Sequence, residues 1–194
     1  MPILKNCITI TQDFISKEIS EVHSFEFSDS LEFAINLQKK NVGAEIFIDC
    51  DEDSFLLKMK CNLTGNEKEI TSTSEVEIKG LVPFIAIDPE GVILMQAFGN
   101  TNALDLSIQS GFAHYYSRSR NKLWKKGEES GNLQKISKIS YLEKTPAIIF
   151  KIQKRIPSCH TGFYSCYYRK LRGDSFVEVY SKKEFDPEKI YKGK

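Results

Sequence analysis

Two short stretches, far apart in the sequence, carry the residue types of a metal-assisted hydrolase. Residues 159–166 (CHTGFYSC) place two cysteines on either side of a histidine, and residues 49–53 (DCDED) place a cysteine inside a cluster of acids. Thiolates are typical zinc ligands, whereas carboxylate oxygens bind hard cations such as magnesium. Imidazole titrates near neutral pH, which makes His160 a candidate general acid or base.

The acidic stretch has two interpretations. Aspartate is a common turn residue, so one or two acids at this place need no function. Four acids in five positions repel one another, however, and a bound divalent cation would offset that repulsion. Asp49, Asp51 and Asp53 alternate and could converge on one hard cation, with Cys50 pointing the other way. The pattern alone does not choose between a solvated acidic turn and a metal site.

A third stretch, residues 118–132, is basic and polar. It contains two Arg, three Lys, two Ser and two Gly. Backbone amides and cationic side chains of this kind can cradle a phosphate group. An exposed basic loop is the alternative, and it is the simpler interpretation for this segment taken alone.

The composition is that of a globular protein in a reducing compartment. The chain has five cysteines, an odd number that argues against a closed disulfide framework. Its apolar runs, such as residues 147–150, are too short to span a bilayer, and its first residues lack the apolar stretch of a signal peptide. We therefore expect a cytoplasmic protein with no membrane or nucleic-acid partner.

The net charge of +1 hides an asymmetry between the two halves of the chain. Residues 1–75 contain 7 basic and 14 acidic residues, and residues 76–194 contain the other 20 and 12. Oppositely charged halves favour docking against each other, and a basic half suits a phosphorylated ligand.

The elements that must position these stretches are mostly strands. Alternating or β-branched runs predict strands within 7–11, 23–27, 44–48, 54–61, 84–88, 92–98, 112–117, 133–141, 147–154 and 176–180. Helices are expected from Asp29 or Ser30 to about Lys40, and from Asn100 or Thr101 to Ser110. Residues 44–61 read as a hairpin with the acidic cluster at its turn. The expected fold class is α+β, with mainly antiparallel sheets and few helices.

The sequence suggests three parts. Residues 1–75 form an N-terminal half with the acidic hairpin, residues 76–181 form a second domain, and residues 182–194 form a frayed-looking tail. Residues 62–75 are polar and rich in Thr and Ser, which makes them the best linker candidate. Both halves read strand, strand, helix, strand, so a duplicated arrangement is possible.

Residues 80–169 resemble the phosphoribosyl-AMP cyclohydrolases, enzymes of histidine biosynthesis that open the adenine ring of phosphoribosyl-AMP between N1 and C6. The resemblance rests on several long motifs in the order of that family. They are GLVP (80–83), GVILM (91–95), HYYSRSR (114–120), LWKKGEESG (123–131) and CHTG (159–162), closing at Cys166.

The sequence departs from the family pattern in an informative way. The family carries an Asp-Cys-Asp-x-Asp hairpin shortly before CHTG, where this chain has residues 141–145 (YLEKT). Here that motif stands at 49–53, more than a hundred residues before CHTG. Because the family site combines the hairpin of one subunit with the late cysteines of the other, we expect one chain to imitate the dimer. Asn132 also replaces a usual histidine, Ile87 a usual glutamine and Gly99 a usual methionine.

The resemblance implies the following site. Cys50, Cys159 and Cys166 would hold zinc, which lowers the pKa of bound water to roughly 7, and Asp49, Asp51 and Asp53 would hold magnesium. His160 would be the general acid or base, or would instead orient a ligand by a hydrogen bond. Substrate-binding candidates are Arg118, Arg120, Lys126 and Ser130 for phosphate, Trp124 or Tyr116 for the base, and His114 as an orienting residue.

The expected function is the metal-dependent opening of the adenine ring of phosphoribosyl-AMP to the formimino-carboxamide ribotide, in a monomeric pseudo-dimer or a homodimer. Two alternatives stay open. One is a divergent zinc hydrolase that acts on another purine-like nucleotide. The other is a non-catalytic, zinc-stabilised nucleotide-binding protein.

Overall fold

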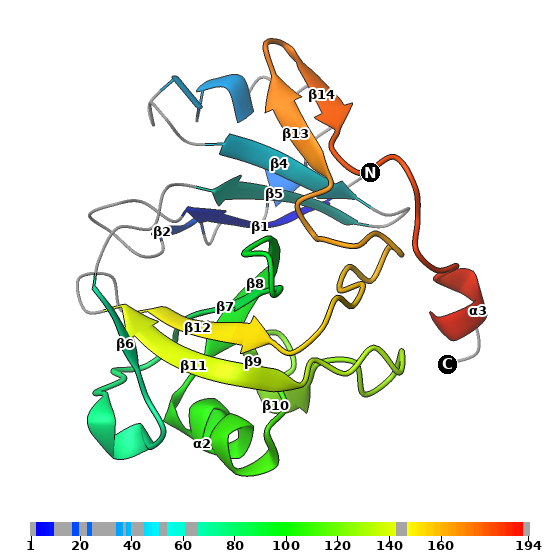
Figure 1. Cartoon of the computed structure of the whole chain (residues 1–194). Coiled ribbons are helices and arrows are strands. Elements are labelled where there is room, and N and C mark those ends of the chain that lie inside the picture. The colour runs from blue at the N-terminus through cyan, green and yellow to red at the C-terminus, as the bar shows by residue number, and fades with distance from the viewer. Residues whose placement is uncertain are drawn as a thin grey trace.

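The computed structural model describes residues 3–9, 17–19, 23–24, 34–36, 38–39, 45–50, 54–60, 66–142 and 147–191. Within this part, the strands form two sheets of seven strands each (Figure 1). Most neighbouring strands run antiparallel and helices are few, so the α+β class is confirmed. No helix in the described part is long and apolar enough to cross a membrane.

The sheet that carries the basic stretch is built mainly from residues after 80. From edge to edge its strands are β10 (Lys122–Lys125), β9 (His114–Ser117), β8 (Ile93–Gly99), β7 (Val82–Ile87), β12 (Ala147–Ile152), β11 (Ile136–Leu142) and β6 (Glu67–Glu69). The central strands β7 and β12 run parallel and are apolar almost throughout. Continuous apolar runs of this kind are expected for strands that are covered on both faces.

One face of this sheet is covered by α2 (Thr101–Ser110). The Asn100 side chain caps this helix by accepting a hydrogen bond from the Ala103 amide, and Gly111 ends it in the left-handed conformation. Ala103 and Leu104 pack into a core with Phe84, Phe150 and Tyr115. The helix therefore forms as the sequence predicts, and it fixes β9, which leads into the basic stretch.

The other sheet combines the first strands of the chain with the last two. Its order is β14 (Ser175–Glu178), β13 (Arg169–Arg172), β4 (Glu45–Cys50), β5 (Ser54–Lys60), β1 (Ile3–Thr9) and β2 (Lys17–Ile19), and β3 (His23–Ser24) also pairs with β1. β4 and β5 are antiparallel and Cys50 lies opposite Phe55, so the predicted hairpin is confirmed. Residues 51–53 at its turn lie outside the described residues.

The two sheets share one arrangement of strands. The order β4-β5-β1-β2 in one sheet corresponds to β11-β12-β7-β8 in the other, with the same parallel and antiparallel pairings. The strand that follows each hairpin pairs with the other sheet: β6 joins β11, and β13 joins β4. This is the pattern expected for two copies of one unit that exchange an edge strand.

Two sequence-based expectations need correction. The proposed linker at 62–75 contains β6 and a short 3-10 helix, η1 (Thr73–Glu75), because β6 pairs in register with β11 and Ser72 and Glu75 form a capping box. The tail looked frayed in sequence, yet its described part contains the short helix α3 (Glu188–Tyr191). The domain bounds 1–75, 76–181 and 182–194 stay a prediction, and so does the duplication.

Candidate active site

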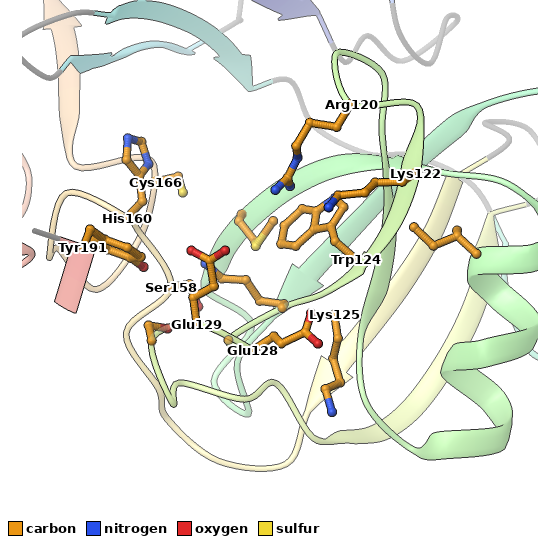
Figure 2. A pocket seen from close by; sticks show the side chains of 15 residues that line it. Arg120, Lys122, Trp124, Lys125, Glu128, Glu129, Ser158, His160, Cys166 and Tyr191 are labelled. Carbon is orange, nitrogen blue, oxygen red and sulfur yellow. The ribbon is translucent and has the colours of Figure 1, made fainter. Parts of the chain in front are cut away.

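A cavity of about 340 Å³ opens where the basic stretch faces the CHTG loop (Figure 2). One wall comes from β10 and the turn after it, and the other from the segment that contains Ser158, His160 and Cys166. Met95 of β8 and Tyr191 of α3 complete the lining. The cavity thus brings together two stretches that the sequence singled out independently.

The CHTG loop is held in a compact shape by its own backbone. The Cys159 amide donates to the Phe163 carbonyl over 3.1 Å, and the Ser158 amide donates to the Tyr164 carbonyl over 2.9 Å. The Cys166 amide donates to the Leu94 carbonyl over 2.8 Å, which fastens the loop to β8. Both cysteines are nearly fully buried, and Cys159 Sγ lies 2.9 Å from Thr161 Oγ1. The loop therefore holds two buried thiols, of which that of Cys166 lines the cavity.

A buried carboxylate anchors the same loop to the turn between β7 and β8. Asp88, at the β7–β8 turn, is fully buried and accepts hydrogen bonds from the Glu90 and Val92 amides and from the Tyr164 hydroxyl, the last at 2.6 Å. Burial and the hydrogen bond to Asp88 raise the pKa of Tyr164 to about 12. The Arg155 guanidinium stacks 4.6 Å from the centre of the same ring.

Replacing Tyr164 with phenylalanine should lower the free energy of unfolding by about 1–3 kcal/mol, because Asp88 would keep a buried oxygen without its donor. Urea unfolding monitored by circular dichroism measures the change. Tyr180→Phe, which alters a neighbouring phenol that packs on Tyr164, is the matched control and should cost less. An equal cost for both variants would contradict the anchoring role of Asp88.

The same variant should change the alkaline limit of stability. The pKa of Tyr164 is raised on folding, so its contribution is complete below about pH 10 and is lost as the pH rises through about 12. Tyr164→Phe should therefore show a shallower loss of unfolding free energy above pH 10 than the unmodified protein.

A second buried network connects the two walls of the cavity. The Tyr115 hydroxyl donates to Gln134 Oε1 over 3.0 Å, and Gln134 Nε2 donates to Ser158 Oγ over 2.9 Å. Gln134 is fully buried, and Ser158 lines the cavity directly before Cys159. Tyr115 also stacks on Trp124, with ring centres 5.0 Å apart, so one core residue orients both sides of the cavity.

The basic stretch is partly a strand and partly a tight turn. β10 pairs with β9, so Trp124 lies opposite Tyr115. After β10, the Gly131 amide donates to the Gly127 carbonyl over 2.9 Å. Gly127 has a φ of +86°, and a Cβ on it would lie 2.1 Å from the Asn132 carbonyl oxygen. Only glycine fits there, and the close turn presents Lys126 and Ser130 to the cavity.

The structure gathers most of the predicted substrate-binding residues. Arg120, Trp124, Lys126 and Ser130 line the cavity, together with His160. Figure 2 shows the Arg120 side chain above Trp124 and directed toward the cavity.

Three predicted contacts lie elsewhere. Arg118 and Tyr116 line a different depression beside Asn121, where the Arg118 guanidinium stacks 4.3 Å from the centre of the Phe98 ring. Burial lowers the pKa of Arg118. His114 on β9 has its Nδ1 2.8 Å from the Phe112 carbonyl oxygen and is not among the lining residues. Their roles in substrate binding stay predictions.

The predicted metal ligands fall into two groups. Cys159 and Cys166 are described in full, whereas only the backbone of Asp49 and Cys50 is described, and Asp51 and Asp53 lie outside the described residues. Among the side chains that the structure describes, no three of His, Cys, Asp and Glu form a metal-binding group. The zinc and magnesium sets both depend on residues beyond that part and stay predictions.

The strand pairing brings the acidic hairpin toward the late cysteines. β13 begins three residues after Cys166 and pairs antiparallel with β4, with Arg169 opposite Ile48. Because the pairing is antiparallel, the β4 residues from Ile48 to Cys50 run in the same direction as the chain traced backward from Arg169 to Cys166. The Phe47 and Tyr167 rings make an edge contact with centres 5.1 Å apart. The backbone of β4 therefore runs beside the segment that follows Cys166.

Sequence reasoning missed Tyr191, Ser158 and Lys122 as lining residues. Tyr191 belongs to the tail that was read as frayed, and the only signal was an aromatic residue among charged ones. Ser158 directly precedes Cys159, so its place next to the thiol could have been noticed.

Known proteins of one family match this chain. The family model described as "PRA-CH: Phosphoribosyl-AMP cyclohydrolase" matches residues 95–168. A phosphoribosyl-AMP cyclohydrolase of Leptospira interrogans is 41% identical over 143 residues, which cover 73% of this chain and 76% of the relative. Another, of Methanospirillum hungatei, is 47% identical over 129 residues, covering 66% of this chain and 94% of the relative. These matches confirm the resemblance and the expectation of an enzyme: the chain belongs to the phosphoribosyl-AMP cyclohydrolase family.

Proposed function

We propose that this protein hydrolyses phosphoribosyl-AMP, opening the adenine ring between N1 and C6 in histidine biosynthesis. The observation that carries the proposal is that His160 and the Cys166 thiol line the same cavity as the basic turn after β10. Relatives named for this activity share 41–47% of their residues with the chain over most of their own length.

Ring opening requires that water adds at C6 and that a proton reaches N1. His160 is exposed within the cavity, and its imidazole can take a proton from the attacking water and return it to the departing nitrogen. Trp124, braced by Tyr115, offers an indole face on which the base can pack. Arg120 and Lys126 supply cationic contacts for a phosphate group.

The donor set fits a zinc ion. Two buried thiols that share one loop are a typical part of a thiolate zinc site, and Thr161 is placed to hydrogen-bond the Cys159 sulfur. Cys50, Cys159 and Cys166 would hold zinc and Asp49, Asp51 and Asp53 magnesium, and ions bound there would supply Lewis acidity. The protein's own contribution is the rigid loop and its anchors to Leu94 and Asp88.

We further propose that each chain carries one composite site. The loop between β12 and β13 spans residues 153–168 and contains both late cysteines, whereas its counterpart between β5 and β6 spans only 61–66. Conversely, the hairpin β4–β5 carries the acids that the corresponding hairpin β11–β12 lacks. The first copy would then retain the acidic hairpin and the second copy the loop with the late cysteines. Strand β13, which pairs with β4, would bring the hairpin and the loop together.

Metal removal tests the proposal. Protein dialysed against a chelator should lose conversion of phosphoribosyl-AMP, measured by the absorbance change on ring opening, and zinc with magnesium should restore it. Metal analysis of the unmodified protein should find one zinc per chain. Full activity after complete metal removal would contradict metal dependence, and no turnover by metal-loaded protein would contradict the proposed function.

A further inference from the structure

The C-terminal segment, residues 182–191, is docked against the CHTG loop. The Glu184 amide donates to the Gly162 carbonyl over 2.8 Å, and Lys183 Nζ lies 5.9 Å from the centre of the Phe163 ring. Gly162 has a φ of +96°, and a Cβ on it would lie 2.4 Å from the Phe185 carbonyl oxygen. The loop that carries both late cysteines thus has a surface shaped to receive this segment.

The segment ends by placing Tyr191 inside the cavity. The Ile190 and Tyr191 amides both donate to the Pro187 carbonyl and close the short helix α3. Tyr191 lines the cavity together with Ser130 and Glu129. Burial, chiefly, and the nearby Glu129 carboxylate raise the pKa of Tyr191, so its hydroxyl remains a donor at neutral pH.

Cationic groups lie on one side of the cavity, and hydroxyl and carboxylate groups lie on the other. Figure 2 shows Tyr191 on the side of His160 and Cys166, and Arg120, Lys122 and Trp124 on the opposite side. Arg120 and Lys122 are cations that suit a phosphate. Tyr191, Ser130 and Glu129 combine hydroxyl groups with a carboxylate acceptor, a set that suits the vicinal hydroxyls of a sugar and repels a phosphate.

We infer that Tyr191 is a substrate-positioning residue that, together with Ser130 and Glu129, binds a ribose hydroxyl of the nucleotide. The inference rests on the proposed function for the identity of the ligand. It assigns Ser130 to the sugar instead of the phosphate. It also gives the C-terminal segment a function, because this segment supplies one wall of the cavity.

The experiment measures nucleotide binding apart from turnover. Trp124 is the single tryptophan of the chain and lines the cavity, so its fluorescence reports binding of AMP and of 2′,3′-dideoxy-AMP. The proteins compared are the full-length unmodified chain, Tyr191→Phe, Tyr191→Ala, Ser130→Ala and the double variant Tyr191→Phe/Ser130→Ala. Lys189→Ala, on an exposed position of the same helix, is the matched control.

The unmodified protein should bind AMP more tightly than dideoxy-AMP, and this preference should shrink about 3–10-fold in Tyr191→Phe, as expected for one hydrogen bond. The double variant should bind AMP no more weakly than the single variant with the lower affinity, because Tyr191→Phe and Ser130→Ala each remove part of one contact. KM for phosphoribosyl-AMP should rise in parallel while kcat changes little. Lys189→Ala should behave as the unmodified protein.

An unchanged preference in Tyr191→Phe and Tyr191→Ala, with turnover by the unmodified protein, would overturn only this inference. A lost preference without any turnover by the unmodified protein would overturn only the proposed function. If the unmodified protein neither binds AMP nor converts phosphoribosyl-AMP, both are overturned.

Discussion

Cys166→Ser is expected to lower kcat/KM for phosphoribosyl-AMP by about three orders of magnitude or more, equivalent to about 4 kcal/mol of transition-state stabilisation. The thiol is nearly buried, lines the cavity next to His160 and is fixed by the hydrogen bond of its amide to Leu94. Serine keeps the size of the side chain but is a much weaker zinc ligand than a thiolate. Steady-state kinetics with metal analysis of the purified variant provide the measurement.

Cys159→Ser and Cys50→Ser should behave alike, because all three thiolates are proposed to hold one ion. Cys7→Ser is the matched control, since Cys7 lies in β1 and has no proposed role in the site. Circular dichroism should show that every variant is folded. A Cys50→Ser protein with full zinc content and full activity would contradict the composite centre while leaving the assignment of Cys159 and Cys166 intact.

His160→Ala should reduce kcat by about 10²–10⁴-fold with a smaller effect on KM, the range expected for loss of a general acid or base. His160 is the exposed residue between two buried neighbours, Cys159 and Thr161, so its replacement should leave the loop in place. Stopped assays at saturating substrate give kcat directly. Added imidazole should restore part of the activity to the variant if the ring transfers a proton.

His114→Ala is the matched control for this result. Its ring is held by the Phe112 carbonyl at the end of α2 and does not line the cavity, so kcat should fall less than tenfold. Zinc content separates the two roles considered for His160. If His160→Ala loses zinc and imidazole does not restore activity, His160 orients a metal ligand and does not transfer the proton.

Much of the fold follows from local patterns in the sequence. The helix from Thr101 to Ser110 formed between a predicted cap and a predicted glycine stop, because both signals act within one or two turns. The hairpins β4–β5, β7–β8 and β11–β12 were likewise predictable from alternating apolar runs separated by turn residues.

The pairing of distant strands was not predictable in this way. β6 is three charged residues with no apolar alternation, and it forms a strand only because β11 presents an open edge to it. β13 (RKLR) is similarly polar and was not expected, yet it pairs with β4 across more than a hundred residues. Edge strands of this kind are decided by tertiary context, which local propensity does not contain.

The residues of the candidate site also divide into those that a local motif predicts and those that only the tertiary structure reveals. His160, Cys166, Trp124 and Lys126 could be chosen from motifs, since each stands in a stretch whose composition is unusual. Tyr191 could not, because its place depends on backbone contacts between Gly162 and Glu184 that no local pattern reveals.

The exchange of β6 and β13 has a consequence for how the polypeptide is made. One edge of β4 has no strand to pair with until β13, which ends at Arg172, has been synthesised. The sheet of the first strands is therefore completed only after almost the entire chain has been made. Contacts of such long sequence separation slow folding and leave an unpaired edge exposed to aggregation. Two separately produced fragments cut between Lys60 and Glu67 should each be poorly soluble, and mixing them during refolding should recover the native assembly.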